Sequence, residues 1–483
     1  MDKKRRIKSP NILFAIADDA SHMGAYGHKY VKTPYFDRVA TEGILFNNAF
    51  TTNPKCAPSR ASILTGKHTW QLEEACTHFC VFPNKFKLYP DLLEEVGYHV
   101  GFTGKGWGPG DWKRNGLKRN PAGNDYSNIT LTPIENTNIC NVDYFENFKV
   151  FMSERKEDQP FYFWYGSREP HRPYIQGEGS RLDTTLDEVD VPSYIPNEEV
   201  VKSDYLDYAS EINYFDEQLG KILNYLQEIG EYDNTLIIVT SDNGAPFPRI
   251  KGQMFEQDFN LPLAICWKER VKGGRVVDDL VSFIDFMPTF LDVAGIPIDE
   301  DLPGKSLMDI LESKQDGIIS KERKQIYMGK ERHDLGRKDD KGYPVRCIRT
   351  DKFLYIRNFE PERWPVGNPE TNFPNCDNSP TKSRILFNQH NSDDYYFNMC
   401  FGKRPMEELY DIQEDIECIN NLSDKKNYQN IKQKLWNDLK NELKRTNDPR
   451  IFGKGDIFDT YEYVNETRCK HSWKKYINNK NIE

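Results

Sequence analysis

The sequence predicts an α/β protein with a doubly wound sheet, followed by a smaller α+β C-terminal domain that carries an antiparallel sheet. Three observations lead to this prediction. Short apolar runs alternate with helical patterns as far as Gly295, several of the runs end in charged or amide side chains, and strand-like runs follow one another after that point. We expect residues 1–344 and 345–483 to form the two domains.

The apolar runs before Gly295 are continuous, which is typical of strands covered on both faces of a sheet. The predicted strands of this domain are 11–17, 98–102, 161–165 and 235–240, and its predicted helices are 35–42, the segment behind Ser59, 88–96, 203–229 and 283–293. After Gly295, strand-like runs at 325–329, 345–348 and 352–356 indicate antiparallel pairing, and a last helix is predicted over 425–443. Segment 111–150 is rich in Asn, Gly, Thr and Pro, so we expect a loop with short elements there, and 360–405 is a polar stretch rich in Pro and Asn.

Composition excludes some classes of partner. The chain has 483 residues, a formal net charge of -10 and a pI near 5.6, whereas nucleic-acid binding needs a broad basic face. No run of about 18 apolar residues is present, so no membrane span is expected. The basic segment 1–10 precedes no apolar leader segment. We expect a periplasmic or secreted protein if a leader has been removed, or otherwise a cytoplasmic one, and a monomer or homodimer.

Four predicted strands end in polar side chains that could share one site. Asp18-Asp19, Lys105, Arg168 with His171, and Asp242-Asn243 follow these strands. The carboxyl ends of strands in an open α/β sheet form the active-site edge, so these side chains should converge. A lone Asp-Asp pair is more often a cap or a loop hydrogen-bonding pair, but a second Asp-Asn pair favours a metal site. An all-oxygen donor set favours calcium or magnesium over zinc.

A reactive thiol is predicted beside this edge. Cys56 lies on a turn fixed by Pro58, and a helical pattern begins behind Ser59, which places the thiol near a helix N-terminus that attracts anions. Cations that could neutralise a bound oxyanion are Arg60, Lys105, His171 and Lys251. Each lysine or arginine alone is more often a solvated surface charge, whereas His171, between two prolines and two arginines, is an improbable core residue.

The stretch Cys56-Ala57-Pro58-Ser59-Arg60, with 61–66 behind it, resembles the signature of type I sulfatases, in which the cysteine is oxidised to formylglycine. The motifs Gly104-Lys105, Pro170-His171, 241–244 and Lys251-Gly252 follow in that family's order, and 408–412 with 421–422 is similar to its C-terminal subdomain. The resemblance spans nearly the whole chain and implies an alkaline-phosphatase-like fold.

The resemblance also implies a mechanism. A formylglycine hydrate attacks sulfur, a covalent sulfo-enzyme forms, and the second hydroxyl then expels sulfate. Carried over by position, the residues that hold Ca²⁺ (or Mg²⁺) are Asp18, Asp19, Cys56, Asp242 and Asn243. Arg60 would hold the diol, Lys105 and Lys251 the sulfate oxygens, and His171 the sulfate or the leaving group. A formylglycine-generating or anaerobic maturation enzyme is the implied partner that converts Cys56.

Within the family, 241–248 and Gly108-Pro109 are most similar to heparan N-sulfatase, the sulfamidase group, as is 343–346 preceded by His333. The candidate substrate-binding residues are Trp107, Arg172, His333 and Arg346. Trp107 stands where many relatives have a histidine, which leaves the identity of the leaving-group acid open.

The predicted activity is hydrolysis of a sulfate group from a sulfated saccharide, with N-sulfoglucosamine as a candidate substrate. Three alternatives stay open at this point. One is an O-sulfatase acting on another sulfated polysaccharide fragment, since one fold serves several saccharides. The second is a metal-dependent phosphatase or phosphodiesterase, which usually needs two zinc ions and histidine ligands where this chain has Asp242-Asn243. The third is a saccharide-binding protein without turnover.

Overall fold

The computed structural model describes residues 9–391, 394–464, 469 and 471–480. Its larger part is built on an eight-stranded sheet with the strand order β11-β2-β10-β9-β1-β8-β5-β7. The strands are β1 (Asn11–Ala17), β2 (Ile44–Phe46), β5 (His99–Gly104), β7 (Asn124–Asp125), β8 (Phe161–Gly166), β9 (Thr235–Ser241), β10 (Leu263–Cys266) and β11 (Arg275–Val277). Only β10 runs antiparallel to its neighbours among these strands.

Strand β1 lies between β8 and β9, and the register of these strands brings their carboxyl ends together. Ala17 pairs with Ser241 of β9, Ile16 pairs with Gly166 of β8, and Gly104 of β5 pairs with Gly166 from the other side. The residues that follow these strands therefore leave the sheet at one edge, as the sequence predicted.

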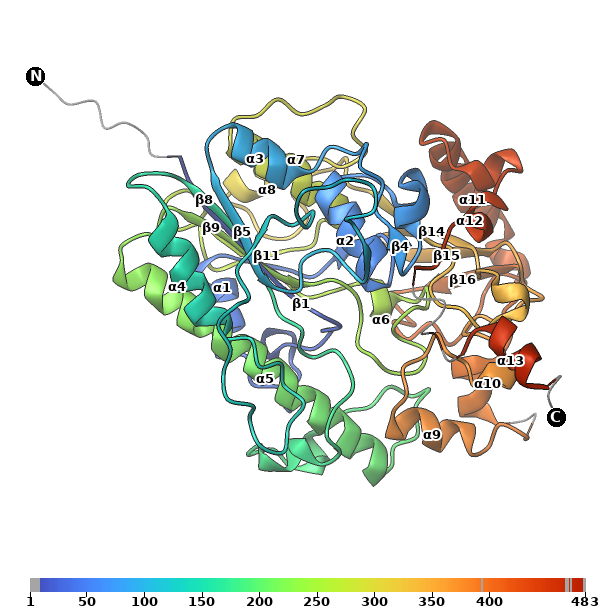
Figure 1. Cartoon of the computed structure of the whole chain (residues 1–483). Helices are drawn as coiled ribbons and strands as arrows, with labels where there is room; N and C mark the ends of the chain where they lie inside the picture. Colours follow the sequence, from blue (N-terminus) through green and yellow to red (C-terminus); the bar gives the residue numbers. More distant parts are fainter. Residues whose placement is uncertain (1–8, 392–393, 465–468, 470, 481–483) are drawn as a thin grey trace, which may run out of the picture.

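Helices cover both faces of this sheet (Figure 1). One face carries α1 (Pro34–Glu42), α4 (Tyr144–Glu154) and α5 (Glu199–Glu228), and the other carries α2 (Cys56–Thr65), α3 (Tyr89–Glu95), α7 (Phe286–Val293) and α8 (Met308–Glu312). Alternate residues of β1 enter the two cores: Leu13 and Ala15 pack on the α5 side, and Ile12 and Phe14 on the α2 side. The continuous apolar run of β1 is therefore a consequence of burial on both faces.

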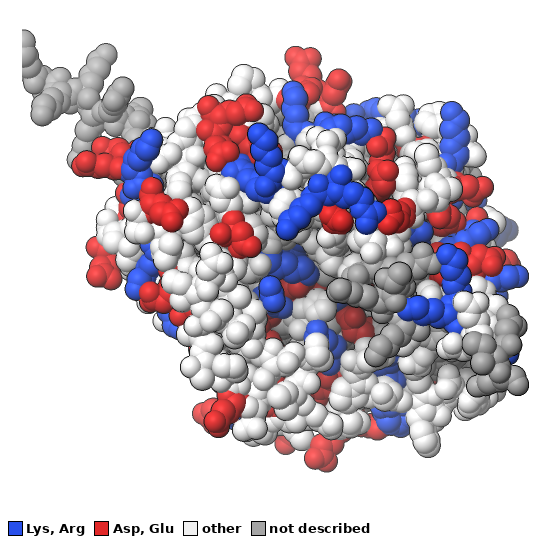
Figure 2. Space-filling view, in the orientation of Figure 1, with Lys and Arg blue, Asp and Glu red and all other residues white. Residues whose placement is uncertain are grey.

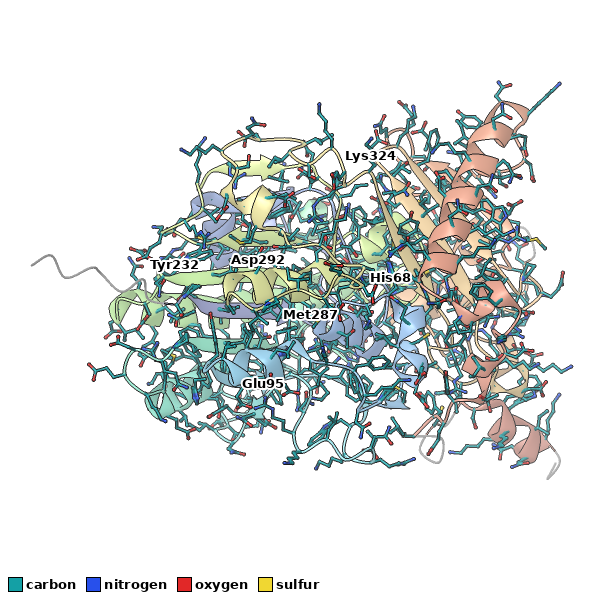
Figure 3. The ribbon with its side chains drawn as sticks, turned by 90° about the horizontal axis from the view of Figure 1, so that it is seen from above. His68, Glu95, Tyr232, Met287, Asp292 and Lys324 are labelled. Atoms are coloured by element: carbon teal, nitrogen blue, oxygen red, sulfur yellow. The ribbon has the colours of Figure 1, made fainter. Side chains whose placement is uncertain are left out.

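A second, antiparallel sheet lies C-terminally, in the order β13-β14-β15-β16. Its strands are β13 (Gln325–Lys330), β14 (Val345–Thr350), β15 (Phe353–Asn358) and β16 (Glu407–Asp411), and α11 (Gln429–Arg445) covers one face. Figure 3 shows His68 of the α/β unit on the side that faces α11. Because β13 belongs to this sheet, the sheet begins before the expected boundary at 344/345, and that division of the chain stays a prediction.

The predicted fold class is confirmed, with several local differences. The segment 111–150 contains the start of α4, whose Asp143 caps the helix by accepting from the backbone N–H of Glu146. The polar segment 360–405, for which no helix was predicted, contains α9 (Pro380–Leu386) and α10 (Tyr395–Phe401). Strands β2, β10 and β11 were not predicted. These elements are short, and their positions depend on tertiary packing more than on local pattern.

The remaining elements are β3 (Ala49–Phe50), β4 (Cys80–Val81), β6 (Gly110–Asp111), β12 (Val281–Ser282), α6 (Glu256–Phe259), α12 (Ile457–Thr460) and α13 (Trp473–Lys480), together with short 3-10 turns. In the described part of the chain, no helix is long and apolar enough to cross a membrane. Figure 2 shows acidic and basic side chains intermixed on the visible face. Most of the basic N-terminal segment, 1–8, lies outside the described residues.

Candidate active site

Helix α2 presents Cys56 at its first residue, inside the α/β unit. Every residue of α2 is buried, and the helix ends at Gly66 in a left-handed conformation (φ 62°). The hydroxyl of Ser59 donates to the backbone carbonyl of Asp242 at 2.6 Å, and Thr51 donates to Ser59 at 2.8 Å. These bonds attach the N-terminus of α2 to the end of β9 and fix residue 56 beside the carboxylates there.

The predicted metal ligands converge at the ends of β1 and β9. Ligand atoms of Asp18, Asp19 and Asp242 lie within 4.8 Å of one another, and those of Asp18, Cys56 and His171 do so as well. Asp19 adopts a left-handed backbone conformation (φ 75°) that brings its carboxylate next to the amide of Asn243, which donates to it at 2.7 Å. We refer to Asp18, Asp19, Cys56, Asp242 and Asn243 as the Cys56 centre.

The Cys56 centre fits a hard divalent cation. Oδ1 of Asp18 and Oδ1 of Asn243 are buried and have no hydrogen-bond donor in the described part of the chain. A buried, unsatisfied oxygen is costly unless another group satisfies it. Carboxylate and amide oxygens are the ligands preferred by calcium and magnesium, so a cation held here would satisfy these lone pairs.

Three cations hold the carboxylates of the centre. Lys105 Nζ lies 2.5 Å from Asp18 Oδ2, Lys251 Nζ lies 2.6 Å from Asp19 Oδ2, and Arg60 Nε lies 2.7 Å from Asp242 Oδ2. Burial by itself lowers the pKa of Lys105, but the fields of Asp18, Cys56 and Asp242 together outweigh it and raise the pKa above its usual value. The lysines therefore stay charged at the site.

Arg60 also binds the backbone of the loop that carries Lys105. Its guanidinium also donates to the carbonyl oxygens of Lys105, at 2.7 Å, and Gly106, at 3.0 Å. The arginine of the signature therefore holds the loop that carries Lys105 against the end of β9.

His171 stands at the edge of the centre, with 37% of its side chain exposed. Its Nδ1 lies 2.6 Å from the carbonyl oxygen of Arg172, and its Nε2 lies 3.9 Å from Asp19 Oδ2. Burial and Lys251 lower the pKa of His171, but Asp19, Asp18 and the Cys56 thiol raise it to about 9. The imidazole is thus held protonated, with Nδ1–H directed to the backbone.

A cavity of about 960 Å³ opens over this group. Its lining includes Asp18, Lys105, Trp107, His171 and Arg172. Trp107 is nearly buried, and its indole N–H donates to the carbonyl of Ala57 at 3.1 Å. Arg172 is held by a bidentate pair with Asp204, at 2.7 and 2.9 Å. Both residues shape the cavity wall, and both are anchored to the protein.

The two other residues predicted for the substrate rim are buried. His333 is not among the residues that line the cavity, and its Nε2 lies 2.8 Å from Asn53 Oδ1. Arg346 is not among the residues that line the cavity, and its role in substrate binding stays a prediction. Its guanidinium is fully buried and pairs with Asp448 and Glu331. Facing strands of the antiparallel sheet and the C-terminal segment enclose it.

Sequence reasoning did not single out several charged residues of the cavity wall, among them Lys55, His78, Asp334 and Asp377. Lys55 Nζ lies 3.1 Å from Asp334 Oδ2, His78 Nδ1 lies 2.8 Å from Asp334 Oδ1, and Asp377 Oδ2 lies 2.9 Å from Lys251 Nζ. Lys55 could have been found because it directly precedes Cys56. Asp377 lies in the polar segment 360–405, which offers no periodic or motif signal.

Comparison with known proteins identifies the family. A sulfatase family model matches residues 10–296, which is more than half of the chain. This chain belongs to the sulfatase family. A second model, the C-terminal region of N-sulphoglucosamine sulphohydrolase, matches residues 250–370. The reaction class is therefore hydrolysis of a sulfate group, and the Cys56 centre lies within the matched region, with its signature at the start of α2.

The relatives of this sulfatase are named for different substrates. An ulvan-active sulfatase of Formosa agariphila is 28% identical over 91% of this chain and 81% of its own length. Human N-sulphoglucosamine sulphohydrolase is 28% identical over 73% of this chain and 74% of its own length. A protein solved with its substrate D-glucosamine-2-N,6-O-disulfate has the same fold, with a TM-score of 0.66 over 91% of this chain and 99% of that one, at 22% identity.

Proposed function

We propose that this sulfatase removes the sulfate group of a sulfated saccharide and that N-sulfoglucosamine is its substrate. The observation that carries the reaction is the clustering of Cys56, Asp18 and His171 at the start of α2, beside two lysines. The sugar assignment is supported by the match of 250–370 to the C-terminal region of N-sulphoglucosamine sulphohydrolase and by the human relative.

The Cys56 centre would hold Ca²⁺, with Mg²⁺ as the alternative ion. Its oxygen donors are supplied by the ends of β1 and β9, and residue 56 completes the set. A maturation enzyme would convert Cys56 to formylglycine, whose hydrate supplies the attacking oxygen. Ser59 and Arg60 keep residue 56 and the Lys105 loop in fixed positions through their bonds to Asp242.

The lysines are the sulfate-binding groups in this proposal. Lys105 and Lys251 each point an ammonium group at a carboxylate of the centre and keep an N–H that no described side chain takes up. Such donors stabilise the charge that accumulates on sulfate oxygens in the transition state. His171, protonated and partly exposed, would hold the proton that the leaving sugar oxygen or nitrogen needs.

The test is a screen of sulfated sugars with matured, calcium-loaded enzyme, in which free sulfate and the desulfated sugar are both measured. We expect release from N-sulfated glucosamine and no release when metal is removed with a chelator. Release confined to O-sulfated sugars would contradict the N-sulfate assignment and leave the sulfatase reaction intact.

An O-sulfatase on another polysaccharide is the second candidate. The ulvan-active relative matches a larger share of this chain than the human enzyme does. A phosphodiesterase is disfavoured, because the groups that could hold a metal in the described chain include only one histidine, His171. Parallel turnover of an aryl sulfate and an aryl phosphate separates these reactions, and binding without turnover by matured enzyme would favour a saccharide-binding protein.

A further inference from the structure

Lys251, a sulfate-binding group in the proposed function, is held between two carboxylates. Its Nζ lies 2.6 Å from Asp19 Oδ2 and 2.9 Å from Asp377 Oδ2, and only 3% of its side chain is exposed. Asp19 belongs to the Cys56 centre and Asp377 does not. Because Asp19 already fixes the ammonium group, the presence of Asp377 at an anion-binding cavity needs another explanation.

Asp377 faces the cavity from a segment that is tied down. A quarter of its side chain is exposed, and its Oδ1 has no hydrogen-bond partner within the described chain. The buried ammonium of Lys382 donates to the carbonyls of Phe373 and Cys376, at 3.1 and 2.8 Å, and to Asn378 at 3.1 Å. The turn that presents Asp377 is therefore held by interior contacts.

The same segment is joined to the loop that carries His171. Arg172 pairs with Asp204, and the hydroxyl of Thr381 at the start of α9 donates to Asp204 at 2.6 Å. Asp377 and His171 thus keep fixed positions relative to each other across the cavity. The negative charge of Asp377 is secured as well: burial raises its pKa, but Lys251, Lys55 and His171 outweigh this effect and hold the pKa far below its usual value.

A carboxylate repels sulfate, so its free edge must serve another part of the substrate. We propose that Asp377 is a specificity-determining residue whose exposed edge accepts a hydrogen bond from an O–H or N–H of the sugar next to the sulfated atom. Lys251 holds the carboxylate at the wall while it binds the sulfate. Asp377 would thereby favour substrates that carry a hydrogen-bond donor at a fixed distance from the sulfate. This inference rests on the proposed function.

The test compares two ligands on one inactive protein. The parent protein is full-length Cys56→Ala enzyme, and the two variants carry Asp377→Ala or Asp377→Asn in addition. Each protein is titrated with N-sulfated glucosamine and, separately, with inorganic sulfate. Loss of a hydrogen bond to a charged acceptor should weaken saccharide binding about 10- to 100-fold. Sulfate should bind equally well or more tightly, because a repelling charge has been removed. Asp125→Asn is the matched control, since Asp125 lines the same cavity away from Lys251.

Three outcomes would overturn the inference. Unchanged saccharide affinity would show that Asp377 does not contact the sugar. An equal loss for saccharide and sulfate would show that Asp377 acts only through Lys251. A parent protein that binds sulfate but no sulfated saccharide would overturn the proposed function itself, and this result is distinct from the other two. In matured enzyme, Asp377→Asn should raise KM for the saccharide by a clearly larger factor than KM for an aryl sulfate, because the aryl sulfate lacks neighbouring donors.

Discussion

Two groups of buried charges in this sulfatase contain the same kinds of acidic and basic side chains but differ in how their hydrogen bonds are satisfied. The Cys56 centre combines carboxylates with Lys105, Lys251 and Arg60, and the Arg346 cluster combines Arg346 and Arg450 with Glu331 and Asp448. In the Arg346 cluster the guanidinium of Arg346 donates to both carboxylates and to the carbonyls of Lys330 and Val345. Among the described residues, no fully buried side-chain nitrogen or oxygen of this cluster is left without a hydrogen-bond partner.

The Cys56 centre differs in two ways. It leaves oxygens of Asp18 and Asn243 without donors, and it opens onto the large cavity. Charge and burial alone therefore do not distinguish a functional group from a structural one. The distinguishing features are lone pairs that only an added ion can satisfy, and access for a ligand.

The largest expected effect lies at the reacting residue itself. Cys56→Ala should lower sulfate release by about 10⁴-fold or more, because the attacking group is lost. The thermal unfolding midpoint should change little, since alanine suits the first turn of α2. Sulfate release is measured by ion chromatography, and mass spectrometry of the peptide that contains Cys56 should show formylglycine in active wild-type protein. Substantial activity of the alanine variant would contradict the role of residue 56.

Arg346→Met tests the structural side of the comparison. Removing this guanidinium leaves the carboxylates of Glu331 and Asp448 buried without their ion pairs to Arg346. The expected cost is about 3–5 kcal/mol of stability. The thermal unfolding midpoint should fall clearly, while kcat/KM per folded molecule stays near that of wild type. Arg357→Met, on the neighbouring strand, is the control, because its partly exposed pair with Glu407 should contribute only about 0–1 kcal/mol. A specific loss of saccharide affinity would instead support the predicted role of Arg346 in substrate binding.

Lys105→Ala removes a single cation from the Cys56 centre and tests its proposed role in binding sulfate. The loss of one preorganised donor to the sulfate should lower kcat about 10²- to 10³-fold with the fold intact. Lys113→Ala, which changes an exposed lysine of the following loop, should be near neutral. Equal kinetics for the two variants would show that Lys105 serves only to hold Asp18.

The smallest effect is expected where α11 meets the α/β unit, at the pair of His68 Nε2 and Glu442 Oε1, which lie 3.2 Å apart. Burial raises the pKa of Glu442, but hydrogen bonds from His68 and Arg445 outweigh it and lower the pKa to about 2. A lowered folded-state pKa contributes stability above the unfolded value, near 4.5, and that stability is lost as the pH falls toward 2.

Glu442→Gln should therefore cost about 1.5 kcal/mol near pH 7, as expected for a hydrogen bond to a charged group. The difference in thermal unfolding midpoint between the variant and wild type should shrink between pH 5 and pH 3. A difference that stays constant over this range would show that the charge of Glu442 is not involved.

Much of this protein was predictable from local signals. The strand β1 could be predicted because burial on both faces requires a continuous apolar run. The helix behind Cys56 could be predicted because its turn and its motif are contiguous in sequence. The convergence of Asp18 with Asp242 followed from a general property of open α/β sheets, since parallel strands end at one edge. By contrast, α9 and α10 were missed because they are short and lie in a polar segment.

The sequence by itself determined what could be predicted of the chemistry of the site: which residue is proposed to react, which oxygens could hold a cation, and which strand ends carry them. Only the tertiary structure decided which charges face the cavity. Asp377 reaches Lys251 from 126 positions away, and Arg346 is buried by Asp448 from 102 positions away. Such contacts are set by how the C-terminal segments dock on the α/β unit. No local pattern encodes this docking, because it depends on the packing of surfaces that are distant in sequence.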